Sequence, residues 1–185
     1  MVKRAPPGAI RPDEELVRQA RAGDESAQDE LVDRHHAVVY RTVLGILGDA
    51  DDAADATQET FMRAFRALGR FRGEARFRTW LLTIAANAAR GMHRKRERRR
   101  EKPLEEAPDV PASGRDGSDA ASETEEVERV RRLLAKLPEK QRLAVQLRTQ
   151  EGLSFKEVAE IIGSSEGAAR VNYFHGIRRL RGLME

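Results

Sequence analysis

The sequence contains no cysteine, one tryptophan and four histidines in 185 residues. Without cysteine, disulfides and thiolate zinc sites are excluded, and the histidines lack a spaced carboxylate partner, so we expect no metal and no cofactor. The basic start, MVKRAPPGAIRPDEE, is not followed by an apolar run. We therefore expect no signal peptide, no membrane insertion and a cytoplasmic location.

Aromatic residues are also scarce, at 5%, whereas 35% of the residues are charged. No stretch alternates apolar and polar residues over the length of a strand. This composition is typical of small helical domains with wide solvated faces. The predicted fold class is all-α, without a sheet.

Charge divides the chain into three blocks. Residues 1–100 carry 20 basic and 15 acidic side chains, residues 101–128 carry 2 and 10, and residues 129–185 carry 12 and 6. The net charges of +5, −8 and +6 indicate two modules that meet a polyanion, separated by a segment that does not.

The acidic block, EKPLEEAPDVPASGRDGSDAASETEE, is rich in Pro, Gly, Ser and acid and nearly lacks large apolar side chains. It cannot bury enough surface to offset the entropy of ordering, so we predict a flexible linker. The expected organisation is a disordered N-terminus (1–12), a four-helix domain (13–100), the linker (101–126) and a C-terminal helix-turn-helix domain (127–185).

Helical spacing and end signals predict the four helices of the first domain. The first covers about 13–22, with Asp13 as a plausible N-cap, and the second runs from Asp24 to Gly48. The third covers about 50–69 and ends at Gly69, and the fourth covers about 76–99 and loses its apolar face in HRKRERRR.

The C-terminal block shows sharper helix signals. Apolar stripes in VERVRRLLAKL and LPEKQRLAVQLRTQEG predict two helices, the second with Pro138 in its first turn. In the segment that follows, Ser154 and Glu157 form a capping box, Gly163 permits a left-handed turn, and Ser165 can cap the next helix. A short helix, a glycine turn and a longer basic helix predict a helix-turn-helix.

The last helix pair has two interpretations, an ordinary helical hairpin or a DNA reader. Small residues at 167–169 allow the two helices to cross closely. The face opposite the core stripe mixes polar and apolar groups suited to base edges and thymine methyls, with arginines following where phosphates would lie. These are Arg170, Val171, Phe174 and His175, then Arg178, Arg179 and Arg181. We favour DNA binding.

The helix at 50–69 has an acidic face turned away from its apolar stripe. That face comprises Asp52, Asp55, Gln58, Glu59 and Met62. Acids near a helix N-terminus are commonly a solvated face that complements the helix dipole. They can equally form a docking surface for a basic partner, with methionine as an adaptable apolar centre. Charge alone does not separate the two.

The segment FRGEARFRTWL, residues 71–81, interleaves arginines with aromatic side chains around the single Trp80. A lone tryptophan in a helical domain is usually core. Single-stranded nucleic acid, however, is held by aromatic faces inside a basic groove, and the helix that follows presents more cations at helical spacing. The residues concerned are Phe71, Arg72, Arg76, Phe77, Arg78 and Trp80, then Asn87, Arg90 and Arg94.

Two pairs of motifs resemble one known family. They are DADDAADATQETFMRAF with FRGEARFRTWLLTIAANAAR, and LPEKQRLAVQLR with EGLSFKEVAEIIGSSEGAAR. In this order, with a linker between them, they resemble the extracytoplasmic-function (ECF) sigma factors of the sigma-70 family, over residues 13–98 and 127–183. The resemblance implies a two-domain initiation factor for bacterial RNA polymerase, without enzymatic activity of its own.

The resemblance also implies a role for each surface. The acidic face (Asp52, Asp55, Gln58, Glu59, Met62) would bind the coiled coil of the polymerase's largest subunit. Phe71 and Asn87 would capture a flipped base of the minus-ten element, supported by Trp80 and the neighbouring arginines. The second domain would bind the minus-thirty-five element through Arg148, Ser165, Glu166, Arg170, Val171, Phe174, His175 and Arg178. The polymerase flap is a further implied contact.

Further partners implied by the family are promoter DNA and an anti-sigma factor. The main alternative is a helix-turn-helix regulator whose first domain senses a ligand or partner. A sensor domain, however, has no need of the arginine and aromatic ladder after Phe71. A small nuclease ranks lower because the acids lie on the helix at 50–69 and in the linker, away from a basic groove.

Overall fold

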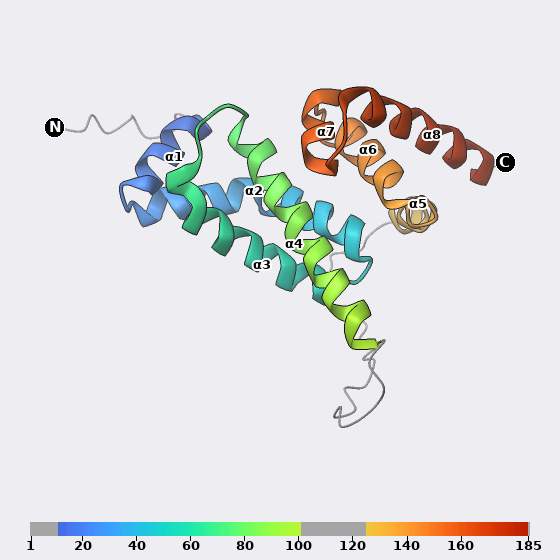
Figure 1. The fold of residues 1–185 in the computed structure, drawn as a ribbon, viewed down its shortest axis with the longest axis horizontal. Helices are drawn as coiled ribbons and strands as arrows, with labels where there is room; N and C mark the ends of the chain where they lie inside the picture. Colours follow the sequence, from blue (N-terminus) through green and yellow to red (C-terminus); the bar gives the residue numbers. More distant parts are fainter. Residues whose placement is uncertain (1–10, 101–124, 185) are drawn as a thin grey trace.

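A computed structural model describes residues 11–100 and 125–184 (Figure 1). Within these ranges the chain is helical and contains no strand, which confirms the all-α class. The elements are α1 (Asp13–Arg21), α2 (Glu25–Leu47), α3 (Ala50–Ala67), the 3-10 turn η1 (Leu68–Arg70), α4 (Phe77–Arg100), α5 (Glu125–Ala135), α6 (Glu139–Thr149), α7 (Phe155–Ile162) and α8 (Glu166–Met184). The expected N-terminal disorder at 1–10 and the linker at 101–124 lie outside the described residues, and α5 begins two residues earlier than expected.

Most helix ends lie where the capping residues predict them. The Asp24 carboxylate accepts from the backbone N–H of Ser26 at 3.0 Å, and Gly48 closes α2 with a φ of 72°. Two expectations are wrong. Pro12, not Asp13, is the N-cap of α1. Helix α3 ends at Ala67 and not at Gly69, which lies in the 3-10 turn that follows.

Asp13 ties α1 to α2 instead of capping its helix. Its carboxylate accepts from Arg34 at 2.7 Å and pairs with His35 at 2.8 Å, and His35 is only 5% exposed. Burial raises the pKa of Asp13, but the hydrogen bonds from His35 and Arg34 outweigh burial, so the net pKa is lowered.

The N-terminal module packs α2, α3 and α4 side by side, with α1 across one end (Figure 1). Leu31, Val39 and Val43 of α2 and Leu81 and Leu82 of α4 belong to one buried cluster, and all five are fully buried. Small alanines on α3 and α4 allow the helices to approach closely.

The C-terminal module is built around the helix-turn-helix of α7 and α8. The predicted capping box is present, with Ser154 and Glu157 exchanging hydrogen bonds, and Gly163 has a φ of 65° that a side chain would strain. A second glycine sets the packing of α8 on α6. A Cβ on Gly176 would lie 2.7 Å from Val145 Cγ2 and 3.2 Å from the Gln141 carbonyl oxygen.

The two modules pack against each other along a seam. In Figure 1, α7 and α6 lie beside α4 and α2, which they contact, and Leu143, Leu147 and Val158 belong to the same buried cluster as the N-terminal core. At the polar edge of this seam, Glu139 and Glu151 of the C-terminal module pair with arginines of the N-terminal module. The seam therefore joins the two halves into a continuous core among the described residues.

Candidate nucleic-acid and partner interfaces

The acidic face of α3 lies largely in solvent. Asp55 and Gln58 are exposed, and Met62 exposes 43% of its surface, a large value for an apolar side chain. Glu59 pairs with Arg63 on the same helix at 2.6 Å, and Asp52 pairs with Arg96 from the basic end of α4. The face thus presents three carboxylates, two of them paired with arginines, around one exposed apolar side chain.

Three aromatic rings form a cluster where η1 leads into α4. The centroids of Phe71 and Trp80 lie 5.0 Å apart, and Phe77 lies 5.8 Å from Trp80 and 5.9 Å from Phe71. Phe77 is only 3% exposed, so it belongs to the core and offers no free face for a base. Phe71 and Trp80 are half-buried and pack against each other and against Phe77.

Arg21 ties this loop to α1, a contact that the sequence did not reveal. Its Nε donates to the Leu68 carbonyl at 2.8 Å, its Nη2 donates to the Phe71 carbonyl, and its guanidinium lies 5.9 Å from the Phe71 ring. Because these are backbone acceptors 47 and 50 residues away, no local pattern could have indicated them.

The predicted polar DNA-binding residues after Phe71 divide into two groups. Arg72, Arg76, Asn87 and Arg94 are exposed. Arg78 and Arg90 instead turn to the C-terminal module. Arg90 Nε donates to a Glu139 carboxylate oxygen at 2.8 Å. Within the exposed group, Arg72 makes only a solvent-exposed pair with Glu74 at 3.7 Å. The second group is shared with the seam.

Glu151 is the centre of the polar seam. Its side chain is 7% exposed, and it pairs with Arg78 of α4 and, at 2.7 Å, with Arg41 of α2. Close by, Thr79 donates to Glu157 at 3.2 Å. Burial raises the pKa of Glu157, but hydrogen bonds from Ser154 and Thr79 outweigh it and lower the net pKa.

The predicted reading face of α8 points outward. Val171 and Phe174 expose 53% and 57% of their surface, and Arg170, His175 and Arg178 are exposed as well. Ser165 accepts from the backbone N–H of Ala168 at 3.2 Å, which confirms its capping role. Large apolar side chains next to cations are the mixture that base edges and thymine methyls require.

The Phe155 ring contacts two arginines of the predicted DNA-binding set, Arg148 and Arg170, although the sequence pattern did not single it out. The guanidinium carbons of Arg148 and Arg170 lie 5.0 and 5.1 Å from its ring centroid. The Tyr173 ring meets it edge-on at 5.6 Å. The sequence showed only that Phe155 opens a helix, because its contacts with Arg148 and Arg170 depend on how α7 packs on α6 and α8.

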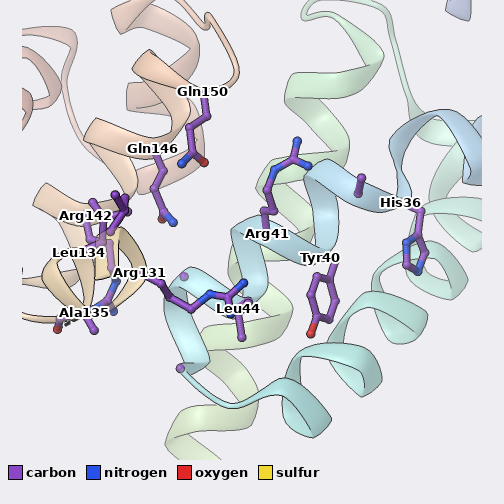
Figure 2. A pocket seen from close by; sticks show the side chains of 14 residues that line it. His36, Tyr40, Arg41, Leu44, Arg131, Leu134, Ala135, Arg142, Gln146 and Gln150 are labelled. Carbon is purple, nitrogen blue, oxygen red and sulfur yellow. Dashed lines mark hydrogen bonds between the residues drawn. The ribbon is translucent and has the colours of Figure 1, made fainter. Parts of the chain in front are cut away.

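A groove opens between the modules, lined by α2 on one side and α5 and α6 on the other (Figure 2). Its volume is about 830 Å³, and Tyr40, Leu44 and Leu134 contribute apolar surface. Gln146 Oε1 is buried there without a hydrogen-bond partner. Burial lowers the pKa of Arg142 at its rim, and Glu139 opposes that shift. The groove therefore lies at the seam, the contact between the two modules.

Neither a metal centre nor a membrane segment stands out in the described ranges. Across 11–100 and 125–184, acidic side chains and histidines do not gather into a group of three that could hold a metal ion. Within the same ranges, every helix is too short or too polar to cross a bilayer.

Comparison with known proteins matches both modules to domain families. Residues 31–99 match the model of sigma-70 region 2, and residues 127–180 match that of sigma-70 region 4. The chain is 34% identical to the RNA polymerase sigma-H factor of Pseudomonas aeruginosa over 175 residues, covering 88% of each chain. It is 33% identical to the ECF RNA polymerase sigma-E factor of Escherichia coli K12 over 170 residues, again covering 88% of each.

Solved structures show the same fold. CnrH, in complex with the cytosolic domain of CnrY, matches with a TM-score of 0.69 at 27% identity, over 93% of this chain and 96% of that one. The sigma factor RpoE of Bartonella quintana, in complex with the anti-sigma factor NepR, matches with a TM-score of 0.68 at 22% identity, over 84% and 95%. The second likeness concerns the fold alone.

Proposed function

This chain belongs to the ECF sigma factors of the sigma-70 family, non-enzymatic factors for the initiation of transcription by RNA polymerase, and from that premise we propose which module binds which partner. The region 2 module (13–100) binds core polymerase and the minus-ten element and opens the duplex. The region 4 module (127–185) reads the minus-thirty-five element. The observation that carries the proposal is the ring cluster of Phe71, Phe77 and Trp80, at the start of a helix lined by arginine.

Core polymerase binds the acidic face of α3. Asp55, Gln58 and Met62 are exposed there, and a carboxylate surface with an apolar centre complements a basic coiled coil of the largest subunit. Asp52 and Glu59 contribute from the same face. The region 4 module makes the second contact, with the polymerase flap.

The docking surface can be tested with purified core polymerase. The double substitution Asp55→Ala and Met62→Ala should lower affinity for core about tenfold or more, because it removes charge and the apolar centre together. Glu14→Ala is the matched control, an exposed acid on α1, away from the α3 surface. Equal loss in both variants would show that net charge alone matters and would contradict a specific surface.

Strand opening uses the loop before α4. Phe71 and Asn87 hold the flipped base, and Trp80 is both part of the core and a wall of the stacking site. Arg72, Arg76 and Arg94 hold the backbone of the opened strand. Phe77 supports the site from the core. Arg78 and Arg90 join only after their pairs with Glu151 and Glu139 exchange for phosphates, because a guanidinium cannot serve both anions fully.

The upstream element is read by α8. Arg170, Val171, Phe174 and His175 face the major groove, Arg178 meets phosphates, and Ser165 and Glu166 lie at the helix start. Arg148 supports this surface from the end of α6. An anti-sigma factor that covers these surfaces is proposed by analogy with CnrH, whose structure is that of a complex with the cytosolic domain of CnrY. We also propose a cytoplasmic location, because the protein would act at the chromosome.

Transcription by core polymerase on genomic DNA, with and without this protein, tests the whole proposal. We expect new transcripts from defined start sites only when the protein is present. Binding to DNA without binding to core, and without new transcripts, would favour the alternative, a helix-turn-helix regulator whose first domain has a sensing role.

A further inference from the structure

The reading surface of the region 4 module contains a ring with two cations beside it. Arg148 comes from the end of α6 and Arg170 from the second turn of α8, and their guanidinium carbons lie 5.0 and 5.1 Å from the Phe155 centroid. Phe155 itself opens α7. One aromatic side chain thus contacts an arginine from each neighbouring helix.

Arg170 has little else to hold it. It is exposed, and the carboxylate beside it is Glu166 at 3.4 Å on its own helix, a solvent-screened pair of small worth. A long side chain in that position samples many rotamers, and binding DNA would require that freedom to be lost. Contact with the ring removes part of this freedom before DNA arrives.

Arg148 is held on two sides. Its Nη1 donates to the Leu153 carbonyl at 2.8 Å, and the Phe155 ring lies beside its guanidinium. Two like charges near one ring repel each other, and the negative ring face offsets part of that repulsion. A guanidinium against a ring keeps its N–H edge available for a phosphate or a guanine.

The ring is itself fixed by its neighbours. Tyr173 meets it edge-on at 5.6 Å, and the Ser154 capping box holds the first turn of α7, from which Phe155 projects. The ring therefore cannot follow a moving arginine, and it sets the positions of both.

We propose that Phe155 is a positioning residue for reading the upstream element, presenting Arg148 and Arg170 to DNA as a preorganised pair. This rests on the proposed function of α8. The ring does not need to touch DNA, because it acts through the two arginines.

The test uses the full chain and a DNA duplex enriched by that chain from a random library. Phe155→Leu keeps an apolar side chain but removes the aromatic face. We expect its affinity for the selected duplex to fall about three- to tenfold, as the loss of two exposed cation–ring contacts implies. Phe155→Tyr restores the face and should bind within about twofold of the unchanged protein.

A double-mutant cycle separates positioning from packing. If Phe155 acts through Arg170, then Phe155→Leu with Arg170→Ala should lose less affinity than the product of the two single losses. Arg179→Ala is the matched control, because it lies on the same helix roughly 13 Å further along the axis. Combined with Phe155→Leu, its effect should simply multiply.

A second readout does not involve DNA. The ring current should shift the side-chain NMR resonances of Arg148 and Arg170 in the unchanged protein and in Phe155→Tyr, and the shift should vanish in Phe155→Leu. Thermal unfolding of each variant checks that the module remains folded.

The outcomes distinguish this proposal from the one on which it rests. If Arg170→Ala weakens DNA binding and Phe155→Leu does not, or if their effects multiply, the positioning role is wrong while reading by α8 stands. If no duplex is enriched, or Arg170→Ala binds like the unchanged protein, reading by α8 is wrong. Loss of the ring-current shift with unchanged affinity would also overturn the positioning role.

Discussion

The two surfaces that we propose to bind DNA hold their arginines in different ways. On the region 4 module, Arg148 and Arg170 lie against an aromatic ring, and the reading face points to solvent. On the region 2 module, Arg78 and Arg90 are paired with Glu151 and Glu139 from the other module.

The difference matters because a ring and a carboxylate compete differently with DNA. A ring leaves a cation its charge and its donors, so DNA can be added without losing the existing contact. A carboxylate neutralises the charge of the arginine and occupies its hydrogen-bond donors, so phosphate must displace it. In the packed arrangement we therefore expect the upstream element to be accessible first, and full engagement of the opened strand to require rearrangement at the seam.

The largest effect is expected at Trp80. Trp80→Ala removes the wall of the stacking site and its contacts with Phe71 and Phe77, and transcription from duplex promoters should fall by about ten- to a hundredfold, as for one lost base-stacking contact. Pre-melted templates should restore most of the activity, and upstream-element binding should be unchanged. Transcript yield on both templates is the measurement.

Trp80→Phe keeps a ring in place and serves as the control. If pre-melted DNA does not rescue Trp80→Ala, and circular dichroism shows a folded protein, strand opening is not the role of this side chain.

The next largest effect is expected at the seam. Glu151→Gln removes the charge that Arg41 and Arg78 share and should weaken packing between the modules by about 1–3 kcal/mol. It should also strengthen binding of single-stranded minus-ten DNA, since Arg78 is released. Because the chain lacks cysteine, one introduced cysteine in each module allows dye labelling, and energy transfer then reports their separation.

Glu160→Gln is the matched control, an exposed acid on α7. It should alter neither energy transfer nor DNA binding. Unchanged transfer in Glu151→Gln would show that apolar contacts alone hold the seam.

A smaller effect is expected inside the region 4 module. Gly176→Ala places a methyl group 2.7 Å from Val145 Cγ2 and should destabilise the module by about 1–3 kcal/mol through overpacking. Gly182→Ala, with open space around it, should instead stabilise α8 by about 0.5–1 kcal/mol. Urea unfolding measures the stability of both variants. If the region 4 and region 2 modules unfold in one transition, the seam couples the two modules. Equal stability of the two variants would contradict the close helix contact.

The smallest effect is a pH dependence at Glu157. Its pKa is lowered in the fold, so its contribution is present above the unfolded pKa and is lost as the pH falls through the lowered value. We expect about 1 kcal/mol or less, the scale of one helix cap. Glu157→Gln keeps one amide oxygen to accept from Ser154 and does not titrate, so its stability should vary less with acid. Parallel acid unfolding curves for the two proteins would contradict this.

Local chemistry in the sequence was enough to predict most helices and the helix-turn-helix. The Ser154 and Glu157 capping box and the turn at Gly163 lie within a few residues of each other, so their geometry depends little on the rest of the chain. The exposure of Arg170, Val171 and Phe174 on α8 also followed from helical spacing.

The errors occurred where a side chain had both a local and a distant partner available. Asp13 looked like an N-cap but pairs with Arg34 and His35, more than 20 residues away. Phe77 was expected among the DNA-binding aromatics and is core, because α4 turns that position toward α2, where its ring lies 5.5 Å from His35.

By itself, the sequence determined the helices, the two basic modules and the surfaces rich in arginine or acid, because periodicity, capping and charge act over a few residues. Only the tertiary structure decided which cations are free. Arg78 and Arg41 meet Glu151 across 73 and 110 residues of chain, and Phe155 reaches Arg170 only after α7 has packed on α8. Such pairings depend on how the helices are brought together, which no local pattern encodes.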